Sequence, residues 1–135
     1  MRQKRILVVD DELFIAHILE FCLAMEGYDV VATGRGEEVS QLIAGLPLDL
    51  AIIDFTLPDT CGLDLARELV ANERLREIPI ILLTTDSDEI DMKEVGRAGV
   101  RTIVTKPINT PELIKTISVL FDASPIEEDE FAETG

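Results

Sequence analysis

Aromatic, basic and sulfur-containing side chains are all scarce in this chain. Aromatic residues make up 4% of the 135 residues and tryptophan is absent, whereas hydrophobic residues in total make up 47%. The core must therefore be built from aliphatic side chains. Lys and Arg number only 12 against 27 Asp and Glu, which gives a formal net charge of −15. We therefore expect no direct contact with nucleic acid and none with an anionic membrane, because both require a basic surface.

The chain also lacks a cysteine framework and a long hydrophobic run. Cys22 and Cys61 show neither the spacing of metal ligands nor that of a disulfide-rich domain, which favours reduced cytoplasmic thiols. The basic start, residues 1–5, is followed by only four apolar residues before Asp10, too few for a signal peptide. No run approaches the length of a membrane span. We therefore expect a cytoplasmic protein, or a cytoplasmic part of a larger one.

What the chain does contain is a fivefold alternation of short β-branched runs with helical patterns, in a length that suits one domain. Strands are predicted near residues 5–9, 28–32, 49–53, 79–83 and 101–104. Helices are predicted near residues 12–26, 36–45, 62–71, 88–98 and 110–121. This alternation predicts right-handed crossovers and a doubly wound α/β fold with a parallel sheet.

The residues at the ends of the predicted helices agree with this pattern. Gly27 and Gly99 follow predicted helices and are expected to be left-handed caps. Thr110 is predicted as the N-cap of the last helix, with Pro111 at its first helical position.

Chemically distinctive residues follow four of the predicted strands. They are Asp10 and Asp11 after the first strand, Asp54 after the third, Thr84 after the fourth and Lys106 after the fifth. Ligands of open parallel sheets bind at the carboxyl ends of the strands, so these side chains are expected at one edge. Several carboxylates at one edge repel one another unless a cation, such as a divalent metal, lies among them. The sequence therefore predicts a functional site.

Residues 5–121 resemble the receiver domain of two-component response regulators, the CheY-like proteins. The resemblance rests on the pair Asp10-Asp11, on Asp54 with Leu57-Pro58-Asp59 and Gly62 after it, on Thr84, and on Lys106-Pro107. Each motif is weak alone, and Asp11 is also a candidate N-cap. In this order and at these spacings they are specific. The resemblance implies a flavodoxin-like three-layer (βα)5 sandwich with strand order 2-1-3-4-5.

The resemblance also implies the chemistry of the site. Asp54 would be the nucleophile that accepts a phosphoryl group from a phosphohistidine. Mg²⁺ would be held by Asp11, Asp54 and the backbone carbonyl of Thr56, with Asp10 acting through a water. Lys106 would pair with Asp54 and later with a phosphoryl oxygen, and its bond to Pro107 is a candidate cis bond.

The resemblance also assigns residues to the conformational switch and to the lifetime of the acyl phosphate. Thr84, favoured over Thr85 by its register, would contact the phosphoryl group and move as the switch. Ile103 stands where the family often carries an aromatic ring that swings inward. Thr56 and Asp86, two residues after Asp54 and Thr84, occupy positions that tune the lifetime of the acyl phosphate. The output surface would be the fourth helix, fifth strand and fifth helix, acting on an effector protein or domain as a monomer or a phosphorylation-dependent dimer.

The first helix carries more apolar residues than one buried face requires. One stripe is predicted to face the sheet and contains Ile15, Ile18, Leu19, Cys22 and Leu23. A second stripe contains Leu13, Phe14, His17, Phe21 and Ala24. Such surface marks an interface, and the resemblance implies docking of a histidine kinase or phosphotransfer protein there and on the loops around the site, Pro107 included. The alternative is that Phe14 and Phe21 fold back over the core.

These patterns divide the chain into a receiver domain, residues 1–121, and an acidic tail or linker, residues 122–135, with six acids and no Lys or Arg. We expect a phosphoacceptor switch that catalyses its own phosphorylation and dephosphorylation, and no conventional turnover enzyme. Alternatives are a phosphorylation-independent scaffold with the same fold and a receiver fragment of a multidomain regulator. A flavodoxin-like cofactor binder is disfavoured, because the first loop has acids where an anionic cofactor would bind.

Overall fold

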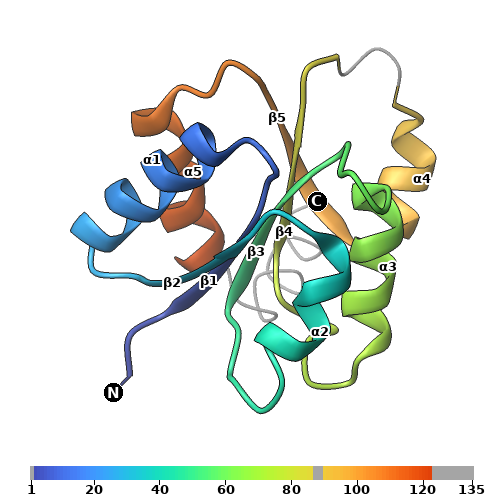
Figure 1. The fold of residues 1–135 in the computed structure, drawn as a ribbon, viewed down its shortest axis with the longest axis horizontal. Helices are drawn as coiled ribbons and strands as arrows, with labels where there is room; N and C mark the ends of the chain where they lie inside the picture. The colour runs from blue at the N-terminus through green and yellow to red at the C-terminus, as the bar shows by residue number, and fades with distance from the viewer. Residues whose placement is uncertain (1, 87–89, 123–135) are drawn as a thin grey trace, which may run out of the picture.

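The computed structural model describes residues 2–86 and 90–122, which form a five-stranded parallel sheet between two layers of helices (Figure 1). The strands are β1 (Arg5–Val9), β2 (Asp29–Thr33), β3 (Leu50–Asp54), β4 (Ile80–Thr84) and β5 (Val100–Thr105), in the order β2-β1-β3-β4-β5. The helices are α1 (Leu13–Met25), the 3₁₀ helix η1 (Gly36–Glu38), α2 (Val39–Leu42), α3 (Gly62–Ala71), α4 (Met92–Arg97) and α5 (Thr110–Asp122). The predicted doubly wound fold and its strand order are confirmed.

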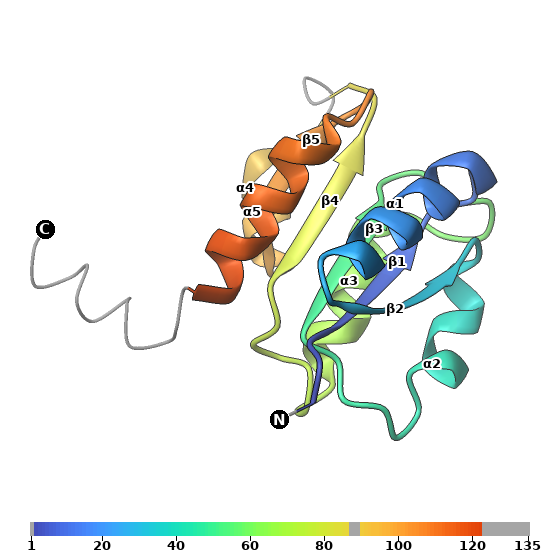
Figure 2. The same cartoon turned by 90° about the vertical axis from the view of Figure 1, so that its left-hand side faces the viewer.

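The two faces of the sheet carry separate aliphatic cores. Helices α1 and α5 lie side by side on one face, and α2, α3 and α4 cover the other (Figures 1 and 2). Side chains alternate along each strand, so Ile6 and Val8 pack under α1 and α5, while Leu7 and Val9 join the opposite core. Burial on both faces explains why the strands are apolar throughout.

Two helices are shorter than predicted. The pattern over residues 36–45 forms η1 and a single turn of α2. After Leu42 the N–H groups of Ala44 and Leu46 bond to carbonyls three residues earlier instead of four, and the chain turns at Gly45, whose φ is +73°. The pattern over residues 88–98 forms α4 from Met92 only. The Asp91 side chain accepts a hydrogen bond from the Lys93 N–H at 2.9 Å, which fixes the start of α4, and residues 87–89 lie outside the described part.

The predicted caps are confirmed in two cases and wrong in one. Gly27 and Gly99 have φ angles of +94° and +85°, as left-handed caps require. The side chain that caps α5 belongs to Asn109 and not to Thr110, which is the first helical residue, so Pro111 is the second helical residue and not the first. The Asn109 Oδ1 atom accepts the Glu112 N–H at 3.1 Å, the bond that an N-cap side chain makes to the third helical residue.

Only the first residue of the predicted tail belongs to the described part of the chain. Asp122, assigned to the tail from sequence, is the last residue of α5, and residues 123–135 lie outside the described part. Within residues 2–86 and 90–122, no helix is both long and apolar enough to cross a membrane.

Candidate functional site

The parallel register places the predicted site residues at one edge of the sheet. Asp10 directly follows β1, Asp54 and Thr84 end β3 and β4, and Lys106 directly follows β5. Val9 is paired with Ile53, Asp54 with Leu83, and Thr84 with Thr105. Four neighbouring strands therefore end level with one another, and their terminal side chains share one site.

Lys106 is the centre of this site. Its Nζ atom lies 2.9 Å from Oε1 of Glu12, 3.0 Å from Oδ2 of Asp10 and 3.1 Å from Oδ2 of Asp54. Burial by itself lowers the pKa of Lys106, but the three carboxylates outweigh it and the pKa is raised above its usual value. Lys106 is therefore a permanent ammonium that balances part of the acidic charge.

Asp10 is the most buried acid in the site, with no exposed surface. Its Oδ1 atom accepts the Glu12 N–H at 2.9 Å, whereas its Oδ2 atom makes an ion pair with Lys106 without hydrogen-bond geometry. Burial and the nearby charge of Asp54 raise the pKa of the Asp10 carboxyl, and the Glu12 N–H and Lys106 offset only part of this effect. One buried acceptor therefore remains available to a cation.

The backbone around Asp54 is tightly constrained. Asp54 Oδ1 accepts the Thr56 N–H at 3.2 Å, and the Gly62 N–H donates to the Phe55 carbonyl at 2.7 Å. A Cβ atom at Gly62 would collide with the Asp54 carbonyl oxygen and lie 2.9 Å from the Phe55 Cα. Glycine is therefore required where α3 begins, because the helix starts against the strand that presents the acid.

Asp59 connects this loop to its neighbour. Its two carboxylate oxygens accept the N–H groups of Gly36 and Glu37 at 3.0 and 2.7 Å, so it caps η1 from a different loop. These hydrogen bonds lower the pKa of Asp59. From sequence, Asp59 served only as part of a motif, and this connection was missed.

Thr84 and Thr85 differ clearly in position. Thr84 is buried and its hydroxyl accepts the Asp86 N–H at 3.2 Å, whereas Thr85 is exposed. The Lys106 N–H donates to the Thr84 carbonyl at 2.7 Å, which ties the lysine to this strand end. Of the two threonines, Thr84 is the one inside the site, and the hydroxyl is bonded within its own loop.

The carboxylates that lie closest together include one that was not predicted. Oxygens of Asp10, Glu12 and Asp54 all lie within 4.8 Å of one another, and this set could hold a metal ion. Asp11, predicted as a direct ligand, is exposed and does not belong to that set. A buried Asp10 oxygen that accepts no hydrogen bond, among hard carboxylate ligands, suits a divalent cation such as Mg²⁺.

The remaining predicted positions differ in exposure. Ile103 is half-buried and packs against the core under α2, α3 and α4. Thr56 and Asp86 are exposed, and Thr56 forms an isolated antiparallel bridge with Cys61. Pro107 is exposed and the Lys106–Pro107 bond is cis, as the resemblance implied.

The outer face of α1 is apolar and exposed. Leu13, Phe14 and Phe21 are 69%, 76% and 67% exposed, and His17 is exposed beside them. The alternative in which the two phenylalanines cover the core is therefore wrong. Ile18, predicted to face the sheet, is also on the exposed side, because the buried positions of α1 are Ala16, Leu19 and Leu23. Met25, which was not predicted, extends the exposed face.

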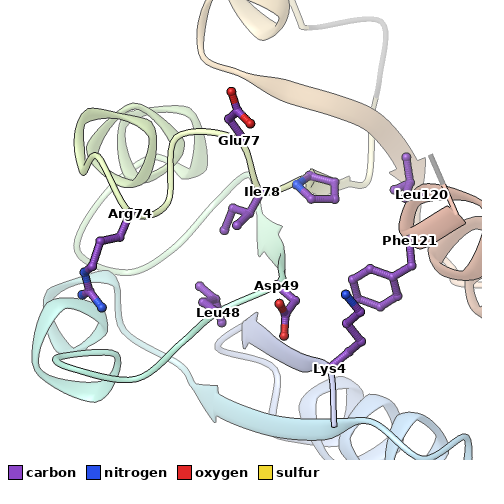
Figure 3. A pocket seen from close by; sticks show the side chains of 9 residues that line it. Lys4, Leu48, Asp49, Arg74, Glu77, Ile78, Leu120 and Phe121 are labelled. Atoms are coloured by element: carbon purple, nitrogen blue, oxygen red, sulfur yellow. The ribbon is translucent and has the colours of Figure 1, made fainter. Parts of the chain in front are cut away.

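A pocket of about 230 Å³ lies at the opposite edge of the sheet (Figure 3). It is lined by residues that precede the strands or end α5, among them Lys4, Asp49 and Phe121, and Lys4 Nζ lies 5.6 Å from the centre of the Phe121 ring. It contains none of the site residues at the carboxyl edge. Its mixed charges and apolar walls select no ligand chemistry.

Comparison with known proteins agrees with this geometry. The family model of the response regulator receiver domain matches residues 6–118. Among solved structures, the chain is similar in fold to the chemotaxis protein CheY4 of Vibrio cholerae, at 24% identity and a TM-score of 0.83, covering 88% of this chain and 99% of that one.

Two further structures are somewhat more similar in sequence. A CheY-like receiver domain protein from Methanospirillum hungatei JF-1 is 27% identical, with a TM-score of 0.78 and coverage of 99% of this chain and 100% of that one. The receiver domain of the Francisella response regulator 1452 is 27% identical, with a TM-score of 0.77 and coverage of 89% and 98%. The chain belongs to the family of response regulator receiver domains.

Proposed function

We propose that this receiver domain is a phosphoacceptor switch that takes a phosphoryl group from a phosphohistidine onto the carboxylate of Asp54. The observation that carries the proposal is the position of Asp54, which is 6% exposed at a strand end and within 3.1 Å of the Lys106 ammonium. A carboxylate that attacks an anionic phosphoryl group needs alignment and charge neutralisation more than it needs a base.

The transfer balances within this arrangement. An oxygen of Asp54 forms a bond to phosphorus, the phosphorus–nitrogen bond of the donor breaks, and the histidine leaves with the electron pair. Lys106, permanently charged, would neutralise an oxygen of the transferred group. The Thr84 hydroxyl, which now donates to the Asp86 carbonyl at 3.4 Å, would donate to a phosphoryl oxygen instead and draw its loop inward.

The carboxylates at this edge fit a divalent cation as cofactor. Asp10 and Asp54 offer buried oxygens that lie within 4.8 Å of each other, and Asp11 and the Thr56 carbonyl remain predicted ligands. Bound Mg²⁺ would supply charge neutralisation for the transferring phosphoryl group. Asp10 would stay buried and hold the start of α1 through the Glu12 N–H.

The partner of this step would dock on α1. The exposed residues Leu13, Phe14 and Phe21 lie on the helix that begins three residues after Asp10, so a protein covering them would also approach Asp54. A histidine kinase or phosphotransfer protein is the donor that the family implies. The protein would act as a switch for an effector and not as a turnover enzyme.

The test is intact mass after incubation with Mg²⁺ and acetyl phosphate, with wild type compared with Asp54→Ala. We expect a Mg²⁺-dependent gain of one phosphoryl group in the wild type only. Labelling of both proteins would place the acceptor elsewhere. Absence of labelling in both, with Mg²⁺ unbound by calorimetry, would favour a scaffold that works by binding through α1.

A further inference from the structure

We propose that Glu12 is a positioning residue that holds the Lys106 ammonium in the unphosphorylated state and thereby slows phosphorylation of Asp54. The inference rests on the proposed function and adds a step to it, in which Lys106 must leave Glu12 before it can bind a phosphoryl oxygen.

The position of the Glu12 side chain is not explained by helix capping. Glu12 is the N-cap residue of α1, yet its side chain makes no capping hydrogen bond. Its Oε1 atom instead accepts a hydrogen bond at 2.9 Å from Lys106, which lies 94 residues later in the chain. The carboxylate therefore serves the site and not the helix.

Three carboxylate oxygens surround the Lys106 ammonium. Nζ donates hydrogen bonds to Glu12 at 2.9 Å and to Asp54 at 3.1 Å, and it makes an ion pair with Asp10 at 3.0 Å. A phosphoryl oxygen can reach the ammonium only where one of these carboxylates leaves. The Glu12 side chain is 57% exposed, against 0% for Asp10 and 9% for Asp54, so water can solvate it after release. Glu12 is therefore the carboxylate that would separate from Lys106.

The charges at the site also favour separation of Glu12 from Lys106. Asp10, Glu12 and Asp54 carry three negative charges against one positive charge on Lys106, so the four groups sum to −2. Asp10 and Asp54 already exceed the charge of the ammonium without Glu12. A carboxylate at the exposed side of the site also repels an anionic phosphoryl donor, and removing it favours both donor binding and release of Lys106.

The primary test compares Glu12→Gln with Glu20→Gln, which removes the same charge from an exposed position of the same helix. We expect Glu12→Gln to be phosphorylated by acetyl phosphate about two- to fivefold faster, as the loss of one partly exposed ion pair allows. The half-saturating acetyl phosphate concentration should fall when it is measured at a Mg²⁺ concentration that saturates both proteins by calorimetry. Glu20→Gln should behave as the wild type.

Three results would overturn the positioning role. Equal acceleration in both variants would indicate a general charge effect, a loss of Mg²⁺ affinity in Glu12→Gln would make Glu12 a metal ligand, and an unchanged rate would show that Glu12 does not compete. Absence of labelling in the wild type would instead defeat the proposed function itself.

A second measurement needs no phosphorylation. In EDTA, the urea unfolding midpoints of Glu12→Gln, Lys106→Met and the double variant form a thermodynamic cycle. We expect non-additive shifts, since the two residues are in contact, whereas Glu20→Gln and Lys106→Met should add. Additive shifts for Glu12 and Lys106 would show that the contact does not hold the ammonium in solution.

Discussion

The ammonium of Lys106 lies 3.1 Å from Oδ2 of Asp54, although 52 residues separate the two in the chain. This contact joins the end of β3 to the residue after β5 across the intervening strand β4. The same ammonium also compensates Asp10, which is fully buried. The lysine therefore stabilises the acidic site, and under the proposed function it would also neutralise the transferred phosphoryl group.

The first prediction concerns the loss of this cation. Lys106→Met should lower the free energy of unfolding by about 1–3 kcal/mol at pH 7 in EDTA, because carboxylates at the site lose their counter-charge. Adding Asp54→Asn to that variant should recover part of the loss, because one of the repelling charges is removed. Urea unfolding of the three proteins measures both effects. A further loss in the double variant would show that repulsion does not dominate.

The second prediction concerns pH. Burial and the Asp54 charge raise the pKa of Asp10, so the folded state binds this proton more tightly than the unfolded state. The stabilising contribution of protonated Asp10 is complete below the unfolded pKa of about 4 and is lost as the pH rises through the raised value. In EDTA, Asp10→Asn should therefore be more stable than the wild type at pH 7. The advantage should shrink as the pH approaches 4, and a less stable Asp10→Asn at pH 7 would contradict the argument.

The third prediction compares alanine substitutions at two glycines, Gly62 and Gly96. Gly62→Ala should lower the free energy of unfolding by about 1–3 kcal/mol, because the new Cβ collides with the backbone of Asp54 and Phe55. Gly96→Ala in α4 meets no atom within 4 Å and should raise stability by about 0.5–1 kcal/mol. In urea unfolding, the changes in the free energy of unfolding of the two variants should have opposite signs. Changes of the same sign would contradict the close approach of the backbone at Gly62.

Much of the fold follows from local sequence signals. Apolar runs mark strands buried on both faces, and Gly27 and Gly99 mark the ends of helices, because these requirements involve neighbouring residues only. The meeting of Asp10, Asp54 and Lys106 follows from topology, since parallel strands present their carboxyl ends at one edge.

Other features depend on distant contacts and could not be predicted this way. Glu12 is bound to a residue 94 positions away, and nothing beside it in sequence distinguishes it from an ordinary exposed acid. Helical spacing permitted Ile18 to face the sheet, but the buried positions of α1 are Ala16, Leu19 and Leu23. Which face of a helix is buried depends on its contacts with distant elements, and α1 contacts β1, β2 and α5.

The fourth prediction concerns the opposite edge of the sheet. Asp49 accepts hydrogen bonds from Arg2 at 2.7 and 2.9 Å and from the Arg5 N–H at 2.7 Å. Burial acts to raise the pKa of Asp49, but these bonds outweigh it and the pKa is lowered. The stability that Asp49 contributes is therefore present above the unfolded pKa of about 4 and is lost as the pH falls through the lowered value.

Asp49→Asn should accordingly cost about 1 kcal/mol at pH 7, a modest value because Arg2 is half exposed. The difference from the wild type should close in acid, below about pH 4. Arg2→Gln should show a smaller loss with the same pH dependence, because the Arg5 N–H still binds Asp49. A pH-independent loss in Asp49→Asn would assign its effect to packing instead of charge.

The last prediction concerns the exposed face of α1. Phe14→Ser and Phe21→Ser remove side chains that are 76% and 67% exposed, so each should change the free energy of unfolding by less than about 0.5 kcal/mol. Phosphorylation by acetyl phosphate should be unchanged, because this small donor needs no docking surface. Transfer from any phosphohistidine protein that labels the wild type should fall, because that protein would bury these rings.

The matched control lies on α5, where Val119 is also apolar and 59% exposed. Val119→Ser should alter neither stability nor the rate of transfer, because α5 is not part of the proposed donor surface. Equal losses for Val119→Ser and Phe21→Ser would indicate a general effect of surface hydrophobicity. Unimpaired transfer to both phenylalanine variants would remove α1 as the docking surface while leaving Asp54 as the acceptor, because the two claims rest on separate observations.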